Sequence, residues 1–306
     1  MVPRLFIETD IFSDVDDVGA IALANVFHLR GEAQLIGIGV NTASRYGPEA
    51  ASILNVIGGS NAPVGRFREV DDSTIDRDYA CDLVTTFGAH SAPIVHESVA
   101  LWRKVLSESA DASVTVVSIG FLTNLADLLK SGADEHSELS GRTLVERKVA
   151  RTVVMAAHFP QGREFNLYTD VEASAEVLAN WPGTIEFVGY EVGKTVLTGH
   201  TLPDTLGSGH PVSRAYAKFW GAGNGRSSWD LIAVFVAVRG TEGLYQLSAP
   251  GRVVMEADGS NTWLFDPEGR HRYLEPLVSD DVVAERLENL LTEFAPAFGA
   301  DGAVAT

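Results

Sequence analysis

The stretch Glu8-Thr9-Asp10-Ile11-Phe12-Ser13-Asp14-Val15-Asp16-Asp17 places four aspartates in one short segment near the start of the chain. Apolar residues 5–7 lead into it, and the apolar, small-residue stretch 18–26 follows it. This order predicts a buried strand that runs into a helix, with the aspartates in the turn between them. Crowded carboxylates repel one another unless a cation or several hydrogen-bond donors lie among them. Because Ca²⁺ and Mg²⁺ prefer oxygen ligands, the turn indicates a metal or catalytic site.

Helix capping is the structural alternative for these aspartates. An aspartate near a helix N-terminus interacts favourably with the helix dipole and accepts hydrogen bonds from free N–H groups. Capping accounts for one or two of the four side chains. An EF-hand loop beginning at Asp14 does not fit, because Asn25 stands where the twelfth position requires a bidentate acid.

The composition predicts a large core and argues against several classes of partner. The 306 residues are 45% hydrophobic and include one cysteine, Cys81, which we interpret as a small core residue. No apolar stretch is long enough to cross a bilayer and the N-terminus lacks secretory-signal features, so we expect a cytoplasmic protein. The net charge of −18 disfavours nucleic-acid polymers and membranes as partners. We expect a small-molecule ligand, neutral, cationic or bridged by a divalent cation.

Strand-like and helix-like segments alternate through the first two thirds of the chain. The predicted strands cover residues 5–7, 35–40, 114–118, 152–155 and 185–188. The predicted helices cover residues 18–30, 48–57, 92–106, 122–130 and 171–179. This alternation predicts an α/β fold with an open, mostly parallel, Rossmann-like sheet flanked by helices. In such folds the ligand site lies at the carboxyl ends of the strands.

The last third of the sequence changes character. Helices are predicted at residues 213–220, 228–238 and 280–294, and a hairpin at residues 253–265 around Asp258-Gly259. We therefore predict one domain over residues 1–306, with an α/β core at 1–190 and a C-terminal helical and hairpin elaboration at 191–306.

Three further segments carry candidate chemical residues. Thr123 and Asn124 stand at the start of a helix, where N-capping is the alternative to ligand binding. Glu164 and Asn166 can present a carboxylate and an amide to sugar hydroxyls from one loop. Asp230 opens an otherwise apolar helix, again as a cap or as a ligand.

In this order, the motifs resemble the nucleoside hydrolase family of the inosine-uridine-preferring type, which cleaves the N-glycosidic bonds of ribonucleosides. The family opens with a strand and Asp-x-Asp-x-x-x-Asp-Asp; here Glu8 holds the first position, Asp10 the second and Asp16-Asp17 the pair. Two extra residues lengthen the turn and add Asp14. Thr-Asn-Leu-Ala matches residues 123–126 and Glu-Phe-Asn matches residues 164–166. The late His-Asp of the family matches Trp229-Asp230, with the histidine missing.

The resemblance implies a Ca²⁺ site whose ligands are Asp10, Asp17, the main-chain carbonyl of Thr123 and Asp230. It also implies that Asp10 is the general base toward a water. The ribose hydroxyls would be held by Asp16 (or Asp14, through the longer turn), Asn41, Glu164 and Asn166. The implied reaction is hydrolysis of a ribonucleoside or related riboside to ribose and free base. Family members are commonly homodimers or homotetramers, so we expect one of these assemblies.

The missing histidine bears on the leaving base, which that residue helps to protonate or orient in many family members. Trp229 cannot donate a proton at neutral pH, although its ring can stack on a base and its N–H can donate a hydrogen bond. His158 and Tyr190 are candidates for leaving-group activation by their position, and for His158 an ordinary polar loop role is equally open. Glu8 in place of aspartate suits a carboxylate behind the ligands better than a direct ligand.

Two rival functions remain open from the sequence. A catalytically weak or silent nucleoside- or ribose-binding protein would keep the calcium ligands and lack the leaving-group acid. A phosphatase of the haloacid-dehalogenase type also begins with a strand and an Asp-x-Asp loop. That class needs a nucleophilic first aspartate and a later lysine near an acidic pair, which this chain supplies poorly.

Overall fold

The computed structural model of the chain describes residues 2–11, 14–67, 70–71, 79–94 and 96–294, so Phe12 and Ser13 of the aspartate turn lie outside the described residues. The strands are β1 (Arg4–Thr9), β2 (Gln34–Val40), β3 (Val64–Arg66), β4 (His96–Glu97), β5 (Val114–Ser118), β6 (Val149–Met155), β7 (Gln161–Arg163), β8 (Ile185–Val188), β9 (Leu197–Thr198), β10 (Arg226–Ser227), β11 (Tyr245–Leu247), β12 (Gly251–Met255), β13 (Ser260–Phe265) and β14 (His271–Pro276). The α-helices are α1 (Asp16–Leu29), α2 (Gly47–Ile57), α3 (Tyr79–Phe87), α4 (Ser98–Glu108), α5 (Thr123–Lys130), α6 (Gly141–Lys148), α7 (Phe165–Thr169), α8 (Val171–Asn180), α9 (Tyr190–Gly193), α10 (Leu202–Thr205), α11 (Pro211–Trp220), α12 (Trp229–Arg239) and α13 (Asp280–Leu291).

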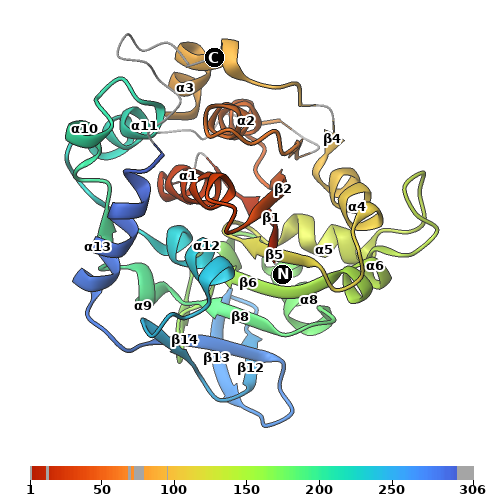
Figure 1. Ribbon diagram of the computed structural model, residues 1–306. Coiled ribbons are helices and arrows are strands. Elements are labelled where there is room, and N and C mark those ends of the chain that lie inside the picture. The colour runs from red at the N-terminus through yellow and green to blue at the C-terminus, as the bar shows by residue number, and fades with distance from the viewer. Residues whose placement is uncertain (1, 12–13, 68–69, 72–78, 95, 295–306) are drawn as a thin grey trace.

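In the described part of the chain, one twelve-stranded sheet runs in the order β4-β3-β2-β1-β5-β6-β8-β14-β12-β13-β7, with β11 paired to β14 (Figure 1). The strands from β4 to β14 in this order are parallel to their neighbours, and β12, β13 and β7 continue the sheet antiparallel. The prediction of an open, mostly parallel sheet flanked by helices is therefore confirmed. Near-continuous apolar strands require this arrangement, because both faces of the sheet must be covered.

The two faces of the sheet carry separate hydrophobic cores, as the alternation of side chains along β1 requires. Leu5 and Ile7 belong to the core beneath α1, α2 and α12, whereas Phe6 belongs to the core beneath α4, α5 and α8. Figure 1 shows these two groups of helices on opposite sides of the central strands. The sheet is thus held rigidly from both sides, which fixes the position of every strand end.

Residues after position 190 complete the central core. Helix α12 packs against α1, β5 and β6, and it is buried from Asp230 to Ala237. Strand β14 joins the sheet beside β8, with His271 opposite Ile185. The predicted hairpin is present as β12 and β13, and through β14 it extends the same sheet. The predicted division at residue 190 therefore crosses one shared sheet and one shared core.

The predicted helix at residues 92–106 is wrong at its start, because α4 begins at Ser98. Residues 91–94 have no helical structure, and Glu97 precedes α4 in an extended conformation with φ −66° and ψ 149°. The pairing of His96 and Glu97 with β3, as strand β4, explains the difference, because these two residues are extended and the helix begins only after them. The short strands β3 and β4 and the parallel strand β14 carry too few apolar residues to be recognised from the sequence.

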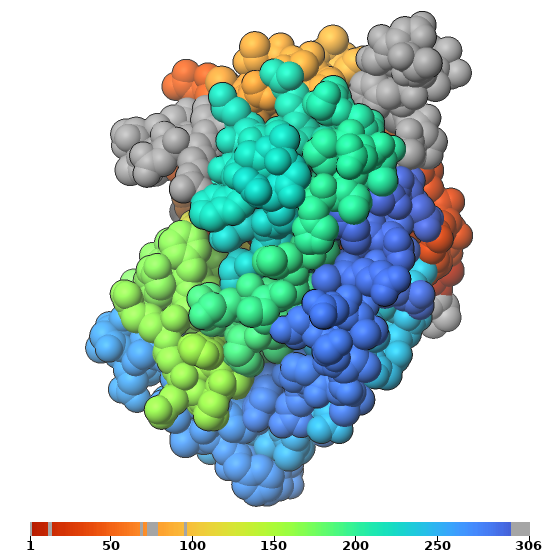
Figure 2. Space-filling view, turned by 90° about the vertical axis from the view of Figure 1, so that its left-hand side faces the viewer, coloured from red at the N-terminus to blue at the C-terminus, as the bar shows by residue number. Residues whose placement is uncertain are grey.

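The surface beside α9 is built by segments from the second half of the chain. Figure 2 shows α11 in teal and α13 in blue on this face, with the green segment around residues 190–205 near them. Helix α13 contacts β9 and α12, and α11 contacts α1 and α3. None of the helices in the described residues is long and apolar enough to cross a membrane.

Gly120→Ala tests how closely the ends of β1, β2 and β5 approach one another. An added Cβ at Gly120 would lie 2.8 Å from Asn41 Oδ1 and from Asp10 Cβ, and would overlap the Asp10 backbone nitrogen. Because backbone cannot yield as a flexible side chain can, we expect a loss of about 1–3 kcal/mol in the free energy of unfolding, measured by urea denaturation. Gly132→Ala is the matched control, since its Cβ would meet no atom within 4 Å. Equal stability of the two variants would contradict the close approach.

Candidate active site

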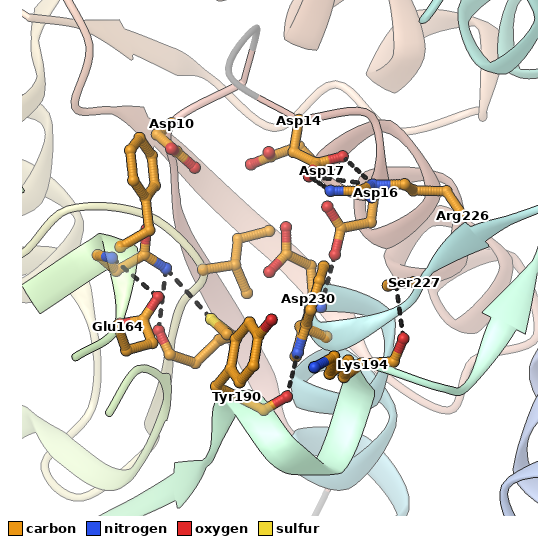
Figure 3. Close-up of a pocket in the computed structure, with 15 residues that line it drawn as sticks. Asp10, Asp14, Asp16, Asp17, Glu164, Tyr190, Lys194, Arg226, Ser227 and Asp230 are labelled. Carbon is orange, nitrogen blue, oxygen red and sulfur yellow. Dashed lines mark hydrogen bonds and ion pairs between the residues drawn. The ribbon is translucent and has the colours of Figure 1, made fainter. Parts of the chain in front are cut away.

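A cavity of about 540 Å³ opens at the carboxyl ends of the parallel strands (Figure 3). Its walls come from the β1–α1 turn, the residue after β5, the end of β6, α7, α9 and the β10–α12 junction. The lining residues are Asp10, Asp14, Asp16, Asp17, Ile119, Met155, Glu164, Phe165, Asn166, Tyr190, Lys194, Arg226, Ser227, Trp229 and Asp230. Seven of the predicted site residues from the turn, the Glu-Phe-Asn loop and α12 thus meet in one place, together with Trp229.

Three carboxylates in this cavity lie close enough to share one ion. Asp16 and Asp17 open α1, Asp230 stands in the first turn of α12, and one oxygen from each lies within 4.8 Å of the others. Each side chain is at most 4% exposed. Burial raises the pKa of all three well above the usual aspartate value, and the negative charges of neighbouring aspartates, Asp10 and Asp14 among them, raise it further.

The donor set around these carboxylates fits a divalent cation. Asp17 Oδ1 accepts a hydrogen bond from the Thr9 hydroxyl, while Asp17 Oδ2 is buried and has no hydrogen-bond partner among the described residues. Asp16 Oδ2 accepts a long hydrogen bond, 3.3 Å, from the Asp230 backbone nitrogen. Buried carboxylate oxygens without donors are costly unless a cation is bound between them. The three residues therefore provide hard oxygen ligands of the kind that Ca²⁺ or Mg²⁺ accepts.

The other two aspartates of the turn have different surroundings. Asp10 follows β1, is 4% exposed and lies near enough to Asp17 to raise the pKa of that carboxyl. Asp14 is held by the Arg226 guanidinium, whose Nε lies 2.9 Å from Oδ1 and 3.1 Å from Oδ2. Figure 3 shows this pair at the edge of the acidic group. Asp14 is thus engaged within the protein, so the structure does not support its prediction as a ribose ligand.

Capping does not explain the aspartate turn. Val15 is the N-cap of α1 and makes no side-chain cap. Besides its bonds from Arg226, Asp14 accepts a hydrogen bond from the backbone nitrogen of Val15, which precedes the first residue of α1. Ser228 likewise caps α12 without a side-chain bond. Glu164 is the exception, because it accepts hydrogen bonds from the backbone nitrogens of Asn166 and Leu167 at the start of α7.

Glu8 organises a layer of polar residues directly behind the cavity. It is fully buried and accepts hydrogen bonds from Trp102 Nε1, from Asn124 Nδ2 at 2.8 Å and from Asn41 Nδ2 at 3.3 Å. Burial raises the pKa of Glu8 to about 7 despite these donors. Glu8 is therefore a carboxylate behind the ligands, as its extra methylene suggests.

Asn41 corrects a prediction from the sequence. It was expected to contact the ribose, but it is absent from the cavity wall, and both ends of its amide are engaged inside the protein. Its Nδ2 donates to Glu8, and its Oδ1 accepts from the backbone nitrogen of Phe121 at 3.2 Å. Asn41 thus connects the ends of β1, β2 and β5 and positions the loop that follows β5.

Thr123 also differs from the prediction. It is the first residue of α5, its hydroxyl donates to Asp170 Oδ2 at 2.8 Å, and it does not line the cavity. Ile119, directly after β5, lines the cavity instead. Ile119 lies at the edge of the sheet where the parallel strands end, whereas Thr123, four residues later, already lies in the flanking helix layer. Nothing in the sequence pattern around Ile119 signals this role, because its side chain is apolar and only its carbonyl could bind.

Glu164 and Asn166 form the wall opposite the acidic cluster. Glu164 accepts from the backbone nitrogens of Ala157, Asn166 and Leu167, and burial raises its pKa to about 7. Asn166 Nδ2 donates to the Met155 carbonyl at 3.1 Å. Both side chains are at most 5% exposed and line the cavity. Their fixed orientation suits recognition of hydroxyl groups.

An aromatic pair, Tyr190 and Trp229, lines another part of the wall. Their rings stack with centroids 5.6 Å apart, and Trp229 Nε1 donates to the Tyr190 carbonyl at 2.6 Å. The indole N–H is therefore engaged, and only the ring face remains for a ligand. His158 does not line the cavity; its ring packs on Tyr190, and Asn261 brackets its backbone. The prediction of a catalytic His158 is not supported by this position.

Comparison with known proteins identifies the family. The model for "Inosine-uridine preferring nucleoside hydrolase" matches residues 5–272. The chain belongs to the nucleoside hydrolase family. A curated member, the pyrimidine-specific ribonucleoside hydrolase RihA of Salmonella newport (strain SL254), is 33% identical over 133 residues, which are 42% of this chain and 39% of that enzyme.

Solved structures of nucleoside hydrolases share the fold. An inosine-guanosine nucleoside hydrolase superposes with a TM-score of 0.73 at 18% identity, covering 96% of this chain and 99% of that one. The inosine-uridine-preferring enzyme of Bacillus anthracis gives 0.69 at 15% identity, covering 95% and 99%. The purine-preferring enzyme of Gardnerella vaginalis gives 0.68 at 16% identity, covering 95% and 98%. The three structures share this fold, although their names state different base preferences.

Glu8→Gln tests the polar layer behind the site. The glutamine amide would present a donor to amide groups that already donate, so at least one buried hydrogen bond would be lost. We expect the free energy of unfolding to fall by about 1–3 kcal/mol in urea denaturation. Glu285→Gln, at an exposed position on α13, is the control and should change stability by less than about 0.5 kcal/mol. A neutral Glu8→Gln would show that the layer carries no stability.

Proposed function

We propose that this nucleoside hydrolase family member cleaves the N-glycosidic bond of a ribonucleoside or related riboside, giving ribose and free base, with Ca²⁺ as its metal. The observation that carries the proposal is the buried cluster of Asp16, Asp17 and Asp230 at one cavity. Residues 16–17 and residue 230, which are far apart in the sequence, meet there, and a bound divalent cation would offset the repulsion among buried carboxylates that have few hydrogen-bond donors.

The proposed carboxylate ligands are Asp10, Asp17 and Asp230, as expected from the sequence. We add Asp16, because it belongs to the same cluster. Ile119, at the cavity wall, is a better source of a main-chain carbonyl ligand than Thr123. Bound Ca²⁺ would supply the positive charge that holds the ribose diol and makes a water easier to deprotonate. Ca²⁺ is preferred to Mg²⁺ because it accepts an irregular set of carboxylates and carbonyls.

The protein groups then divide the remaining work. Asp10 accepts the proton of the water that attacks the anomeric carbon. Glu164 and Asn166 hold ribose hydroxyls from the opposite wall, and their rigid hydrogen bonds favour the flattened ring of the transition state. The surrounding carboxylates stabilise the positive charge that develops on the sugar as the bond to the base breaks. Trp229 offers its ring face to the base.

A catalytically weak or silent binder is the second candidate. The observation that favours it is the engaged indole N–H of Trp229, which stands where family members carry a histidine. An assay with a panel of natural nucleosides and p-nitrophenyl riboside separates the two functions. Turnover of any substrate in the panel would reject the silent binder, whereas ribose-dependent thermal stabilisation without turnover would support it. A homodimer or homotetramer and a cytoplasmic location stay predictions.

Asp10→Asn tests the proposed general base. Because the amide cannot accept the proton, we expect kcat to fall by about 10²–10⁴-fold while the fold is retained. The measurement is steady-state hydrolysis of p-nitrophenyl riboside, with circular dichroism to check the fold. Asp204→Asn, at an exposed position on α10, is the matched control and should leave kcat unchanged. Near-wild-type turnover by Asp10→Asn would remove Asp10 as the base.

Asp230→Ala tests the metal site. Removal of one buried ligand should lower the Ca²⁺ content measured by elemental analysis after dialysis. In the unmodified protein, Ca²⁺ at a hundredfold excess over Kd should raise the free energy of unfolding by about 2.7 kcal/mol, and this gain should shrink in the variant. Asp281→Ala, at an exposed position on α13, is the control. A protein that retains no metal and gains no stability from Ca²⁺ would contradict the site.

A further inference from the structure

Lys194 is a lysine of the cavity wall to which the sequence assigned no role. It follows α9 directly, and its Nζ lies 5.3 Å from the centre of the Tyr190 ring. Together with Tyr190 and Trp229 it lines the cavity, and Figure 3 draws it beside Tyr190, on the other side of the view from Asp10. Lys194 therefore adds a positive charge to the aromatic part of the wall.

The backbone at Lys194 is fixed against α12. The Lys194 carbonyl accepts a hydrogen bond from the Ser227 hydroxyl at 2.8 Å. Gly193 packs directly on Trp229, since an added Cβ would lie 2.6 Å from Trp229 Cγ. The side chain itself is exposed, so its ammonium group can move toward a ligand while its origin stays in place.

The charges of the cavity single out Lys194. Among the described residues, the wall contains six carboxylates and two cations, Lys194 and Arg226. Arg226 is bound to both carboxylate oxygens of Asp14 and packs near the Trp229 ring. In the described part of the chain, the Lys194 ammonium makes a contact with the Tyr190 ring and no ion pair or hydrogen bond. Of the two cations among the described residues of this wall, Lys194 is thus the one that remains available to a substrate.

The reaction under the proposed function creates a need for such a group. When the N-glycosidic bond breaks, its electron pair goes to the base nitrogen, which becomes a poor, negatively charged leaving group unless it is protonated. Trp229 replaces the histidine of this position, and its N–H is engaged. His158 lies outside the cavity wall. No residue assigned so far donates a proton to the leaving base.

We propose that Lys194 is the leaving-group residue of this enzyme, which rests on the proposed hydrolase function. Its ammonium group stabilises the negative charge on the departing base and transfers a proton to the base nitrogen. The attacking water gives its hydroxyl to the anomeric carbon and its proton to Asp10. Asp10 returns this proton to solvent and Lys194 takes one from solvent, so the sum is riboside plus water giving ribose plus base.

The test compares two leaving groups in the Ca²⁺-loaded enzyme. The substrates are p-nitrophenyl riboside, whose nitrophenolate departs without protonation, and whichever nucleoside of the natural panel is cleaved fastest. Lys194→Met should lower kcat for the nucleoside by about 10²-fold and leave kcat for p-nitrophenyl riboside little changed. Lys218→Met, at an exposed position on α11 away from the cavity, should change neither. Because Lys194 is exposed, we expect both variants to fold, which melting temperatures will check.

Each remaining outcome gives a decision. Equal losses on both substrates, or no loss on either, would overturn the leaving-group role of Lys194 and leave the hydrolase function intact. Tyr190→Phe controls for the neighbouring hydroxyl; if it reproduces the nucleoside-selective loss and Lys194→Met does not, the tyrosine is the donor and the proposal is wrong. A wild-type enzyme that cleaves p-nitrophenyl riboside and no nucleoside also overturns the role. A wild-type enzyme that cleaves neither substrate overturns the proposed function itself.

Discussion

The repulsion among Asp16, Asp17 and Asp230 is the constraint on which this structure depends. Each carboxylate is almost inaccessible to water, and burial together with the charges of neighbouring aspartates raises its pKa and so the cost of ionising it. The N-termini of α1 and α12 meet at this point and offset part of the cost through their dipoles. Two packed helices hold the side chains in place, so the cluster cannot relax by moving apart. A divalent cation bound between the carboxylates would lower this electrostatic cost. The fold therefore favours cation binding at the point where it is itself destabilised.

The rigidity of the site comes from what lies behind it. Glu8 accepts hydrogen bonds from amide and indole groups of three separate segments. One of these donors, Asn41, also accepts a hydrogen bond from the backbone of Phe121 and so fixes the loop after β5. Gly120 lets the end of that loop approach Asp10 without a side chain between them. On the opposite side, Arg226 secures Asp14 and thus one end of the long turn. A buried carboxylate with its donors satisfied can position a reactive neighbour without taking part in the chemistry.

The sequence predicted the features that depend on local apolar patterns and on the concentration of aspartates. It did not predict the roles of residues whose position depends on contacts between distant segments. Apolar runs such as residues 114–118 are unmistakable strands, and the concentration of aspartates after β1 indicated the cluster. The prediction of Thr123 as a carbonyl ligand is not supported, because four residues after the end of β5 carry the chain into the helix layer, away from the cavity wall. The prediction of His158 as a catalytic residue is not supported, because its ring packs on Tyr190, which lines the cavity in its place. This contact is visible only in the tertiary structure. No local pattern singles out Lys194 or Ile119, since one is an exposed lysine after a four-residue helix and the other is an apolar residue whose proposed role rests on its main-chain carbonyl.

The replacement of a histidine by Trp229 changes how charge is distributed along the cavity. Carboxylates surround the region proposed for the sugar, whereas the aromatic wall beside it carries Lys194 and lacks an imidazole. Cleavage of a glycosidic bond separates charge in the same sense, positive on the sugar and negative on the base. An electric field in this direction stabilises the transition state more than the uncharged substrate, which is the requirement for catalysis. The tryptophan therefore need not replace the histidine chemically, because stacking can orient the base while a neighbouring cation compensates its charge.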